Sequence, residues 1–325
     1  MKKAISLILV LALLVMAFAG CSAPQAEEED VTIRIGGLKG PTSMGLVKLM
    51  EDNETGEAKN SYEFTIAGSA DEVTPKLVQG ELDIVAVPAN LAAVLYQNTD
   101  GAVQLLAINT LGVIYIVEKG ETINSVADLA GKTIYATGKG STPEYALRYI
   151  LSENGVDPDT DVTIEWKSEP TEVVSTLAAE EGGIAMLPQP YVTVAQGSVE
   201  GLRIAIDLTE AWDALENGSM LLTGVLVVRK DFADAHPQAI ADFLEEYQAS
   251  TEYVNENNAD AAQLIEKFDI VKAAVAEKAL PYCNITYIAG ADMVEPMDGY
   301  LQVLFDQNAE SVGGALPGDD FYYEG

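Results

Sequence analysis

The sequence is poor in several residue types on which common functions depend. Among 325 residues it has one histidine, two cysteines and two tryptophans, and 51 Asp and Glu residues far outnumber 18 Lys and Arg residues. The formal net charge of −33 argues against nucleic-acid binding, because that function needs a basic surface. The cysteines, Cys21 and Cys283, are too few for a disulfide framework. The sequence also lacks metal-site spacings, a nucleophile elbow and a P-loop, so we expect no catalytic residue, metal or cofactor.

The only long hydrophobic run lies in residues 1–20, which predict a signal peptide. Lys2 and Lys3 precede an apolar stretch that is too short for a comfortable membrane span. It ends in Phe18-Ala19-Gly20-Cys21, which resembles a bacterial lipobox, although that pattern prefers leucine at the position of Phe18. The resemblance implies cleavage before Cys21 and a diacylglycerol on its thiol, and a plain secretory signal is the alternative.

Residues 21–30 predict a short acidic tether, because Glu27-Glu28-Glu29-Asp30 is a run of like charge without apolar residues. The lipobox resemblance and the tether together predict an extracytoplasmic protein that is anchored to the bacterial cell membrane through Cys21. Cys283 would then have no partner in its own chain, and we expect it to fill a packed site.

Two glycine-rich loops have similar sequences and similar surroundings. Residues 31–35 have a β pattern, and Lys39-Gly40-Pro41-Thr42-Ser43 leads from them into an apolar run with helical spacing. Residues 133–136 predict another strand, and Lys139-Gly140-Ser141-Thr142 leads from it into a second helical run. A strand, a glycine turn and a helix start aim backbone N–H groups at a ligand. The repetition predicts two lobes that face one cleft.

Strand and helix patterns alternate over most of the remaining chain. Further strands are predicted at residues 62–67, 82–87, 103–108, 113–117, 162–166, 184–187 and 222–228. Regular alternation predicts parallel sheets with helices on both faces. A long polar connection is predicted before residue 222, and helices are predicted to dominate from residue 237 onward.

The order of these motifs resembles that of solute-binding proteins of bacterial ABC transporters. The residues that carry the resemblance are the lipobox, the two loops, Gly80-Glu-Leu82-Asp83-Ile84-Val85 and the phrase Asn124–Lys132. The most similar group is the nitrate, sulfonate and taurine branch, which also contains binders of thiamine precursors. Each motif is loose, but their order covers essentially the whole mature chain.

The resemblance implies an α/β, two-lobed, type II periplasmic-binding-protein fold. Each lobe would be a mostly parallel sheet flanked by helices, and two crossover strands would join them. Residues 31–112 and 226–325 would form the first lobe, and residues 113–225 the second. The implied function is that of a monomeric receptor without enzymatic activity, which captures a small polar solute and delivers it to an ABC permease and its ATPase.

The resemblance also implies a set of ligand contacts in the loops that follow the strands. They are Lys39, Gly40, Pro41, Thr42, Ser43, Ser69, Pro88, Ala89, Asn90, Asn109, Lys139, Ser141, Thr142, Gln189 and Thr223. The placement agrees with the general rule that ligands bind beyond the carboxyl ends of strands in open α/β sheets. We expect the solute to be a sulfonate- or carboxylate-like anion.

Simpler roles remain open for several of these residues. Helix capping alone explains Ser69 and Ser141, and Lys39 and Lys139 are alternatively solvated loop charges. Glutamates such as Glu144 that follow the loops are explained as first-turn acids that complement helix dipoles. For the function, the alternatives are a thiamine-precursor-type pyrimidine or a zwitterion as the solute, and an enzyme or sensor domain on the same fold.

Overall fold

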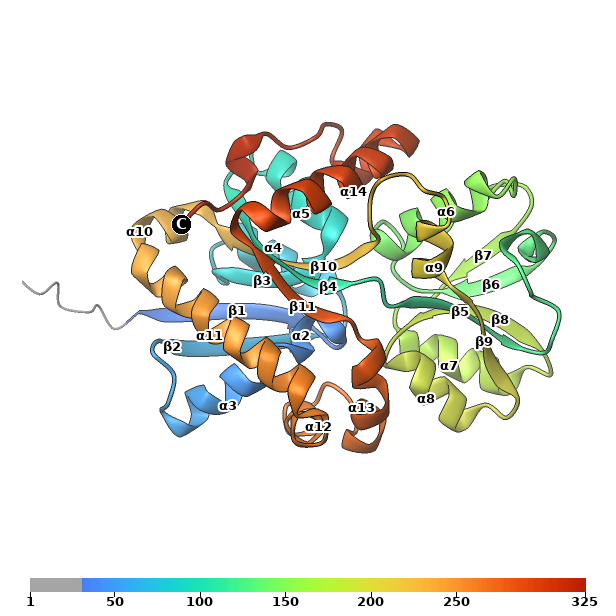
Figure 1. Cartoon of the computed structure of the whole chain (residues 1–325), viewed down its shortest axis with the longest axis horizontal. Helices are drawn as coiled ribbons and strands as arrows, with labels where there is room; N and C mark the ends of the chain where they lie inside the picture. The colour runs from blue at the N-terminus through green and yellow to red at the C-terminus, as the bar shows by residue number, and fades with distance from the viewer. Residues whose placement is uncertain (1–30) are drawn as a thin grey trace, which may run out of the picture. The chain divides into compact units, whose positions relative to one another are not determined.

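Two β-sheets, each between layers of helices, make up the part of the chain that the structure describes, residues 31–325 of a computed structural model (Figure 1). The predicted signal peptide, Cys21 and the tether lie outside the described residues. Within residues 31–325, no helix is both long and apolar enough to cross a membrane.

The first sheet has six strands in the order β11-β4-β10-β3-β1-β2. The strands are β1 (Thr32–Leu38), β2 (Ser61–Ala67), β3 (Ile84–Pro88), β4 (Val103–Leu111), β10 (Leu222–Arg229) and β11 (Ile285–Ala289). β1 runs parallel to β2 and β3, whereas β10 and β11 run antiparallel to their neighbours. We call this sheet and the helices packed on it the first lobe.

The second sheet has five strands in the order β7-β6-β8-β5-β9. They are β5 (Ile114–Lys119), β6 (Thr133–Ala136), β7 (Thr163–Trp166), β8 (Gly183–Pro188) and β9 (Leu202–Asp207). β6 is parallel to β7 and β8, and β5 is antiparallel to β8 and β9. We call this sheet and its helices the second lobe.

The two-lobed α/β architecture predicted from the sequence is confirmed, but the sheets are mixed rather than mostly parallel. The chain leaves the first lobe through β4, enters the second as β5 and returns as β10. A strand that arrives from the other lobe enters its sheet from the opposite end, so β5 and β10 are antiparallel to their neighbours. β9 and β11 were not predicted, because they lie where the sequence indicated a polar connection and helices.

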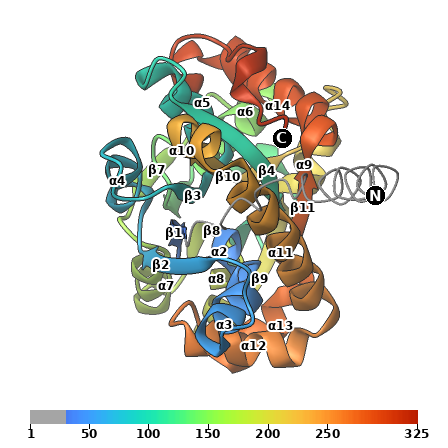
Figure 2. The same cartoon turned by 90° about the vertical axis from the view of Figure 1, so that its left-hand side faces the viewer.

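Helices cover both faces of each sheet. On one side lie α3 (Val47–Thr55), α11 (Pro237–Glu256), α12 (Asn258–Lys267) and α13 (Ala273–Ala279) in the first lobe, and α7 (Pro170–Ala179) and α8 (Tyr191–Ser198) in the second. On the other side lie α5 (Ala89–Asn98) and α14 (Val294–Gln307), and α6 (Thr142–Glu153) and α9 (Leu208–Asp213). Figures 1 and 2 show α5 and α14 above the first sheet and α3, α12 and α13 below it. The short helices are α2 (Pro41–Met44), α4 (Thr74–Val78) and α10 (Lys230–Ala235).

Local sequence explains why these elements form. β3 is apolar along most of its length and buried, as expected of a strand with neighbours on both sides. In α6 the buried residues Ala146, Leu147, Ile150 and Leu151 recur at helical spacing and form one apolar face. α3 ends at Gly56, whose φ of 76° is a left-handed conformation that glycine adopts without strain.

The buried apolar residues form three clusters. One lies between the first sheet and α3, α11, α12 and α13, and it includes Cys283, which is fully buried as predicted. Another lies between the second sheet and α7 and α8. The third runs without interruption from α5 and α14 in the first lobe to α6 and α9 in the second. The two lobes therefore share one hydrophobic core on the side of α5 and α14.

Aromatic and polar side chains meet where this shared core crosses between the lobes. The ring centroid of Trp212 is 4.8 Å from that of Tyr149 and 5.8 Å from that of Tyr300. The Tyr300 hydroxyl donates to Thr142 Oγ1 at 2.9 Å, and Thr142 Oγ1 lies 3.4 Å from Asn90 Oδ1. Asn90, Thr142, Trp212 and Tyr300 are fully buried. We call these four residues and Tyr149 the seam.

On the opposite side, the lobes face each other across a groove. It runs between α8 of the second lobe and α13 of the first, and its volume is about 1340 Å³. Tyr115, Gln189, Lys278 and the exposed ring of Tyr282 lie along it. We call it the rear groove.

The first lobe contains a buried carboxylate that is paired with arginine. Asp83, fully buried at the start of β3, accepts hydrogen bonds from Arg34 Nε at 2.8 Å and Arg34 Nη2 at 2.6 Å. The Arg34 backbone N–H donates to the same carboxylate at 2.9 Å, and Arg229 Nη2 lies 3.5 Å from it. These partners explain an aspartate in the middle of an apolar sequence, because a buried charge is retained only when it is paired.

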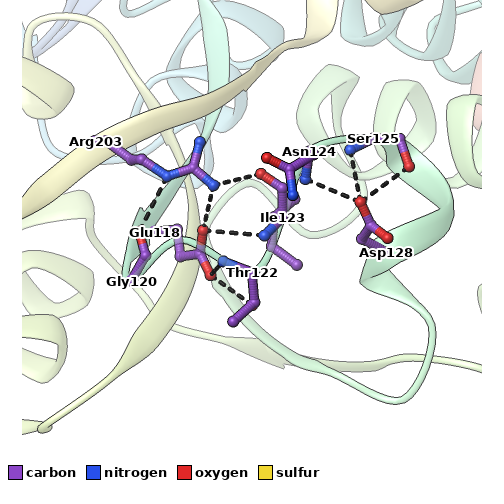
Figure 3. A network of polar contacts seen from close by, with 8 residues as sticks. All are labelled: Glu118, Gly120, Thr122, Ile123, Asn124, Ser125, Asp128 and Arg203. Carbon is purple, nitrogen blue, oxygen red and sulfur yellow. Dashed lines mark hydrogen bonds and ion pairs between the residues drawn. The ribbon is translucent and has the colours of Figure 1, made fainter.

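The second lobe also contains a buried carboxylate paired with arginine, at the end of β5 (Figure 3). Glu118, 3% exposed, accepts hydrogen bonds from Arg203 Nη2 at 2.6 Å, from the Thr122 hydroxyl at 2.6 Å and from the backbone N–H groups of Thr122 and Ile123. Burial acts to raise the pKa of Glu118, but these hydrogen bonds outweigh it and hold the pKa below its ordinary value. The network fixes the loop that leads from β5 to β6.

Candidate functional site

A cavity of about 430 Å³ lies between the two lobes. The loops after β1, β2 and β3 contribute to its wall from the first lobe, and the loops after β6, β7 and β8 contribute from the second. The volume is in the range usual for small-molecule sites. The cavity therefore stands at the carboxyl ends of the strands, where the sequence predicted a binding cleft.

Most of the predicted contact residues line this cavity. They are Lys39, Gly40, Pro41, Thr42, Ser69, Pro88, Lys139, Ser141 and Thr223. Ser69 also caps the short helix that follows it, because Glu72 accepts its N–H in a capping box. Ser141 donates its hydroxyl to the Gly138 carbonyl at 2.9 Å.

Two predicted residues, Asn90 and Thr142, belong to the seam instead of the cavity wall. Asn90 Nδ2 also donates to the Ser311 carbonyl at 2.9 Å. Ala89 precedes Asn90 at the start of α5 and is fully buried in the shared core. These residues join the lobes directly beside the cavity, so their polar atoms have protein partners.

The other predicted residues outside the lining are Ser43, Asn109 and Gln189. Asn109 Nδ2 donates to the Thr42 carbonyl at 3.0 Å and so positions α2. Ser43 is buried, with its Oγ only 2.2 Å from the place that a β-carbon on Gly37 would take. Gln189 lies along the rear groove, and its Oε1 accepts from the Thr193 hydroxyl at 2.9 Å.

Two hydroxyl groups in the cavity wall have no partner. Within residues 31–325, nothing forms a hydrogen bond with Thr42 Oγ1 or Thr223 Oγ1, although both atoms are buried. Gly224 allows this part of α2 to approach β10, because a β-carbon there would lie 2.4 Å from Thr42 Cγ2. A buried hydroxyl without a partner costs about 1–3 kcal/mol.

Three lysines line the cavity, but two of them are paired with carboxylates. Lys39 Nζ lies 2.8 Å from Asp269 Oδ2, and this pair lowers the pKa of Asp269. Lys167 Nζ lies 3.5 Å from Glu165 Oε2. In the described part of the chain, Lys139 alone of the three makes no ion pair.

First-turn glutamates already accept hydrogen bonds from three of the cavity loops. Glu72 Oε1 accepts from the Gly68 N–H at 3.0 Å, Glu144 Oε2 from the Gly140 N–H at 2.7 Å, and Glu172 Oε2 from the Ser168 N–H at 2.9 Å. All three glutamates lie in the first turn of a helix, as predicted. Glu144 also occupies the Gly140 N–H, which belongs to a loop that the sequence suggested as a donor to an anion.

The lobes touch across the mouth of the cavity at two places. The Tyr191 hydroxyl, from the start of α8, donates to the Lys39 carbonyl at 3.4 Å. Glu169 Oε1, from the loop before α7, lies 2.9 Å from the position that a β-carbon on Gly68 would take. We call these the mouth contacts. Burial raises the pKa of Tyr191, so its hydroxyl stays protonated at neutral pH.

Sequence reasoning missed several residues of the cavity wall. They include Leu38, Asp71, Leu91, Val113, Ile114, Lys167 and Tyr191. Each lies within two residues of a strand end or of a predicted contact residue, so proximity to the strand ends is the signal that could have found them. The apolar members give the cavity a hydrophobic wall beside its polar one.

The described residues contain no group of three or more His, Cys, Asp or Glu side chains that could hold a metal ion. The site thus consists of hydroxyls, three lysines, one aspartate and apolar surface between two lobes.

A two-lobed α/β fold with a solute-sized cavity between the lobes is typical of periplasmic substrate-binding proteins. A family model described as "ABC transporter, phosphonate, periplasmic substrate-binding protein" matches residues 53–279, and the chain belongs to this family. It is therefore the solute-binding component of an ABC importer and not an enzyme, as the resemblance implied.

Solved structures of similar proteins show the same fold. An ABC transporter protein from Parabacteroides distasonis is 21% identical with a TM-score of 0.74, and the match covers 91% of this chain and 99% of the other. The alkanesulfonate-binding protein of Xanthomonas axonopodis pv. citri bound to MOPS is 16% identical (TM-score 0.68; 88% and 94% covered). The nitrate-binding protein of Synechocystis PCC 6803 is 15% identical (TM-score 0.60; 91% and 92% covered). A search of curated proteins found no match.

Proposed function

We propose that this receptor captures a small organic oxyanion, sulfonate- or carboxylate-like, in the cavity between the lobes. The observation that carries the proposal is that the cavity is lined by Thr42 and Thr223, whose buried Oγ1 atoms have no partner, and by Lys139, which makes no ion pair among the described residues. Hydroxyl and ammonium groups are donors, and an oxyanion accepts from both. A phosphonate family model and relatives that bind an alkanesulfonate and nitrate are consistent with this class of solute.

The strong negative charge of the chain does not oppose this proposal at short range. Salt screens the repulsion between the solute and distant carboxylates beyond about 8–10 Å. A hydrogen bond to a charged group contributes about 1.5–3 kcal/mol, and Lys139, Thr42 and Thr223, which carry donor groups, line the same cavity. Local donors therefore outweigh the long-range field.

A thermal-shift screen against a metabolite library identifies the solute, because a ligand that binds only the folded state raises the melting temperature. Calorimetric titration of Lys139→Ala with that solute then tests the contact. We expect affinity to fall about tenfold, which corresponds to ~1.4 kcal/mol. The matched control is Lys278→Ala, which removes an exposed lysine from the rear groove. A cationic solute, or an unchanged affinity when Lys39 and Lys139 are both replaced, contradicts the proposal.

A zwitterion or a thiamine-precursor-type pyrimidine is the second candidate. Asp71 lines the cavity, and the Glu169 carboxylate reaches the Gly68 loop at its mouth. These acids would hold a cationic group at one end of the solute. Asp71→Asn weakens binding of such a solute but strengthens or preserves binding of a simple anion, so this variant separates the two candidates.

We also propose that the receptor is anchored to the membrane through a lipid on Cys21, with the tether of residues 21–30 leading to the first lobe. The support is the lipobox-like Phe18-Ala19-Gly20-Cys21. The Cys21→Ser variant should lose metabolic lipid labelling and normal processing. A variant that is still labelled and cleaved at this site rules the anchor out.

We propose, finally, that solute binding rotates the lobes about the segments Asn109–Gly112 and Leu222–Gly224. Each segment contains the end of a strand, β4 or β10, that leads towards the other lobe. A few residues at such a point can absorb the rotation. Small-angle scattering should give a smaller radius of gyration at saturating solute, and an unchanged radius counts against closure.

A further inference from the structure

Lysine side chains line the cavity, but carboxylates compensate most of their positive charge. Its lining holds three lysines and one acid, Asp71. Asp269 lies 2.8 Å from Lys39 Nζ, and Glu165 lies 3.5 Å from Lys167 Nζ. Lys139 and Asp71 are the two charged lining residues without an ion pair among the described residues. Lys139 is therefore the one cation available to an anionic headgroup, and the carboxylate of Asp71 offsets its charge, so the lining and its partners together have no net positive charge.

The backbone N–H groups of the cavity loops add little positive electrostatic potential to the site. The N–H groups of Gly68, Gly140 and Ser168 on three cavity loops already donate to glutamate carboxylates of the following helices. A carboxylate at a helix N-terminus also offsets the partial positive charge of the helix dipole there. These loops therefore present negative charge close to the cavity as well as neutral backbone.

The remaining donors with no partner are neutral. Thr42 and Thr223 offer hydroxyl groups, each of which donates one hydrogen bond without adding charge. Neutral donors satisfy an oxyanion well, but they do not compensate a second negative charge that has been taken out of water.

We propose that the site accepts an anionic group with a single negative charge and discriminates against a doubly charged one, and that Asp269 is a residue that sets this limit by neutralising Lys39. The inference rests on the proposed function, since it concerns the charge of the same bound oxyanion. It separates sulfonates, carboxylates and singly protonated phosphoryl groups, which carry one charge, from phosphoryl dianions, which carry two.

The test compares three series of compounds with the same alkyl chains, from ethyl to hexyl. Alkanesulfonates carry one charge at every pH used, alkyl phosphates change from one charge to two with a second pKa of about 6, and alkanesulfonamides are neutral. Calorimetry at pH 5 and pH 8 gives the affinities. Because about one alkyl phosphate in a hundred is singly charged at pH 8, its affinity should fall about 100-fold between the two pH values. The sulfonate affinity should stay unchanged, and it corrects for any titration of the protein itself.

The Asp269→Asn variant tests the proposed cause. It releases Lys39, and asparagine fits this exposed position because the φ of 55° there is one that Asn and Asp tolerate. The drop in phosphate affinity between pH 5 and pH 8 should become several-fold smaller. The matched control is Asp159→Asn, which breaks an ion pair with Arg148 away from the cavity and should leave the drop at about 100-fold.

The outcomes separate this inference from the function on which it rests. If the sulfonate binds and the phosphate binds as well at pH 8 as at pH 5, or not even at pH 5, the charge limit is overturned while the oxyanion receptor stands. If Asp269→Asn behaves as its control does, the role of Asp269 is overturned. If the sulfonamides bind as tightly as the sulfonates, or if none of the three series binds, the proposed function fails and the inference fails with it.

Discussion

The two lobes meet very differently on opposite sides of the molecule. On the side of α5 and α14 they share a continuous hydrophobic core, in which Trp212, Tyr300 and Thr142 of the seam are fully buried. On the side of α8 and α13 they face each other across the rear groove of about 1340 Å³. The shared hydrophobic core between the lobes therefore lies on one side, whereas on the other side α8 and α13 approach each other along an open groove.

This asymmetry indicates where a rotation between the lobes can take place. Opening the seam would expose buried aromatic surface and a buried hydroxyl pair, which is costly. A rotation that keeps the seam packed would instead change the width of the rear groove and the mouth contacts together. We expect the seam to behave as a pivot and the groove as the space into which the lobes move.

The largest expected effect on stability comes from removing the indole side chain of the seam. Trp212→Ala removes a fully buried indole that contacts rings of both lobes, and it should lower the free energy of unfolding by about 3–5 kcal/mol in urea denaturation. The matched change on the groove side is Tyr282→Ala, whose ring is 59% exposed, and it should stay within about 0.5 kcal/mol. Equal effects of the two substitutions would mean that the seam does not stabilise the protein more than the side of the rear groove does.

The next effect tests whether the seam makes the lobes unfold together. Glu118→Gln weakens the network with Arg203 in the second lobe only, and it should cost about 1.5–3 kcal/mol at pH 7. If the seam couples the lobes, urea unfolding followed by circular dichroism and by tryptophan fluorescence should still show one coincident transition. Two separate transitions would show that the lobes are energetically independent.

The same network gives the variant a defined pH dependence. Because the pKa of Glu118 is lower in the folded protein than the ordinary value of about 4.3, its carboxylate stabilises the fold above that value. This stabilisation is lost as the pH falls through the folded-state pKa. The difference in unfolding free energy between the original chain and Glu118→Gln should therefore be largest near neutral pH and shrink towards pH 3.

A smaller effect is expected from one hydrogen bond of the seam. Tyr300→Phe removes the donor to Thr142 Oγ1 and should cost about 0.5–1.5 kcal/mol of unfolding free energy. Thr142→Val and the double variant complete a double-mutant cycle. A coupling energy near zero would mean that this bond does not hold the lobes together.

The smallest effect on stability is expected at the mouth. Tyr191→Phe removes a single long hydrogen bond to the Lys39 carbonyl and should change the unfolding free energy by less than about 0.5 kcal/mol. It should nevertheless speed release of the solute, because this contact joins the two lobes in the cavity wall. Stopped-flow measurement of the dissociation rate checks this. A loss of stability as large as that of Tyr300→Phe would show that the mouth contact stabilises the fold as much as the hydrogen bond of the seam.

The sequence was a good guide to most strands of both sheets and to the loops, for a physical reason. β3 is a short apolar run and α6 has clear helical periodicity, so local pattern and tertiary environment agree in these elements. The glycine-rich loops then follow from the order of strands and helices, and with them the positions of Thr42 and Thr223 in the cavity wall. β9 and β11 lacked such a pattern: they are only partly buried along most of their length.

What the sequence does not contain is the pairing of residues far apart in the chain. Lys39 and Asp269 are separated by 230 positions, and no local rule links a loop lysine to that aspartate. Asn90 and Thr142 have the residue types of ligand contacts and stand beside the cavity, but α14 places Tyr300 and its neighbours against them. Whether a polar loop residue faces a solute or another element is decided by such packing.

The buried Cys283 has a consequence for redox chemistry outside the cytoplasm. Burial raises the pKa of its thiol to about 12, so the side chain stays in the unreactive thiol form at neutral pH. The side chain is also fully covered by the core around α11 and α13, which bars access to oxidants and to other thiols. A lone cysteine in an oxidising compartment would otherwise invite mixed disulfides between molecules. In this fold it stays a reduced, chemically silent part of the hydrophobic core.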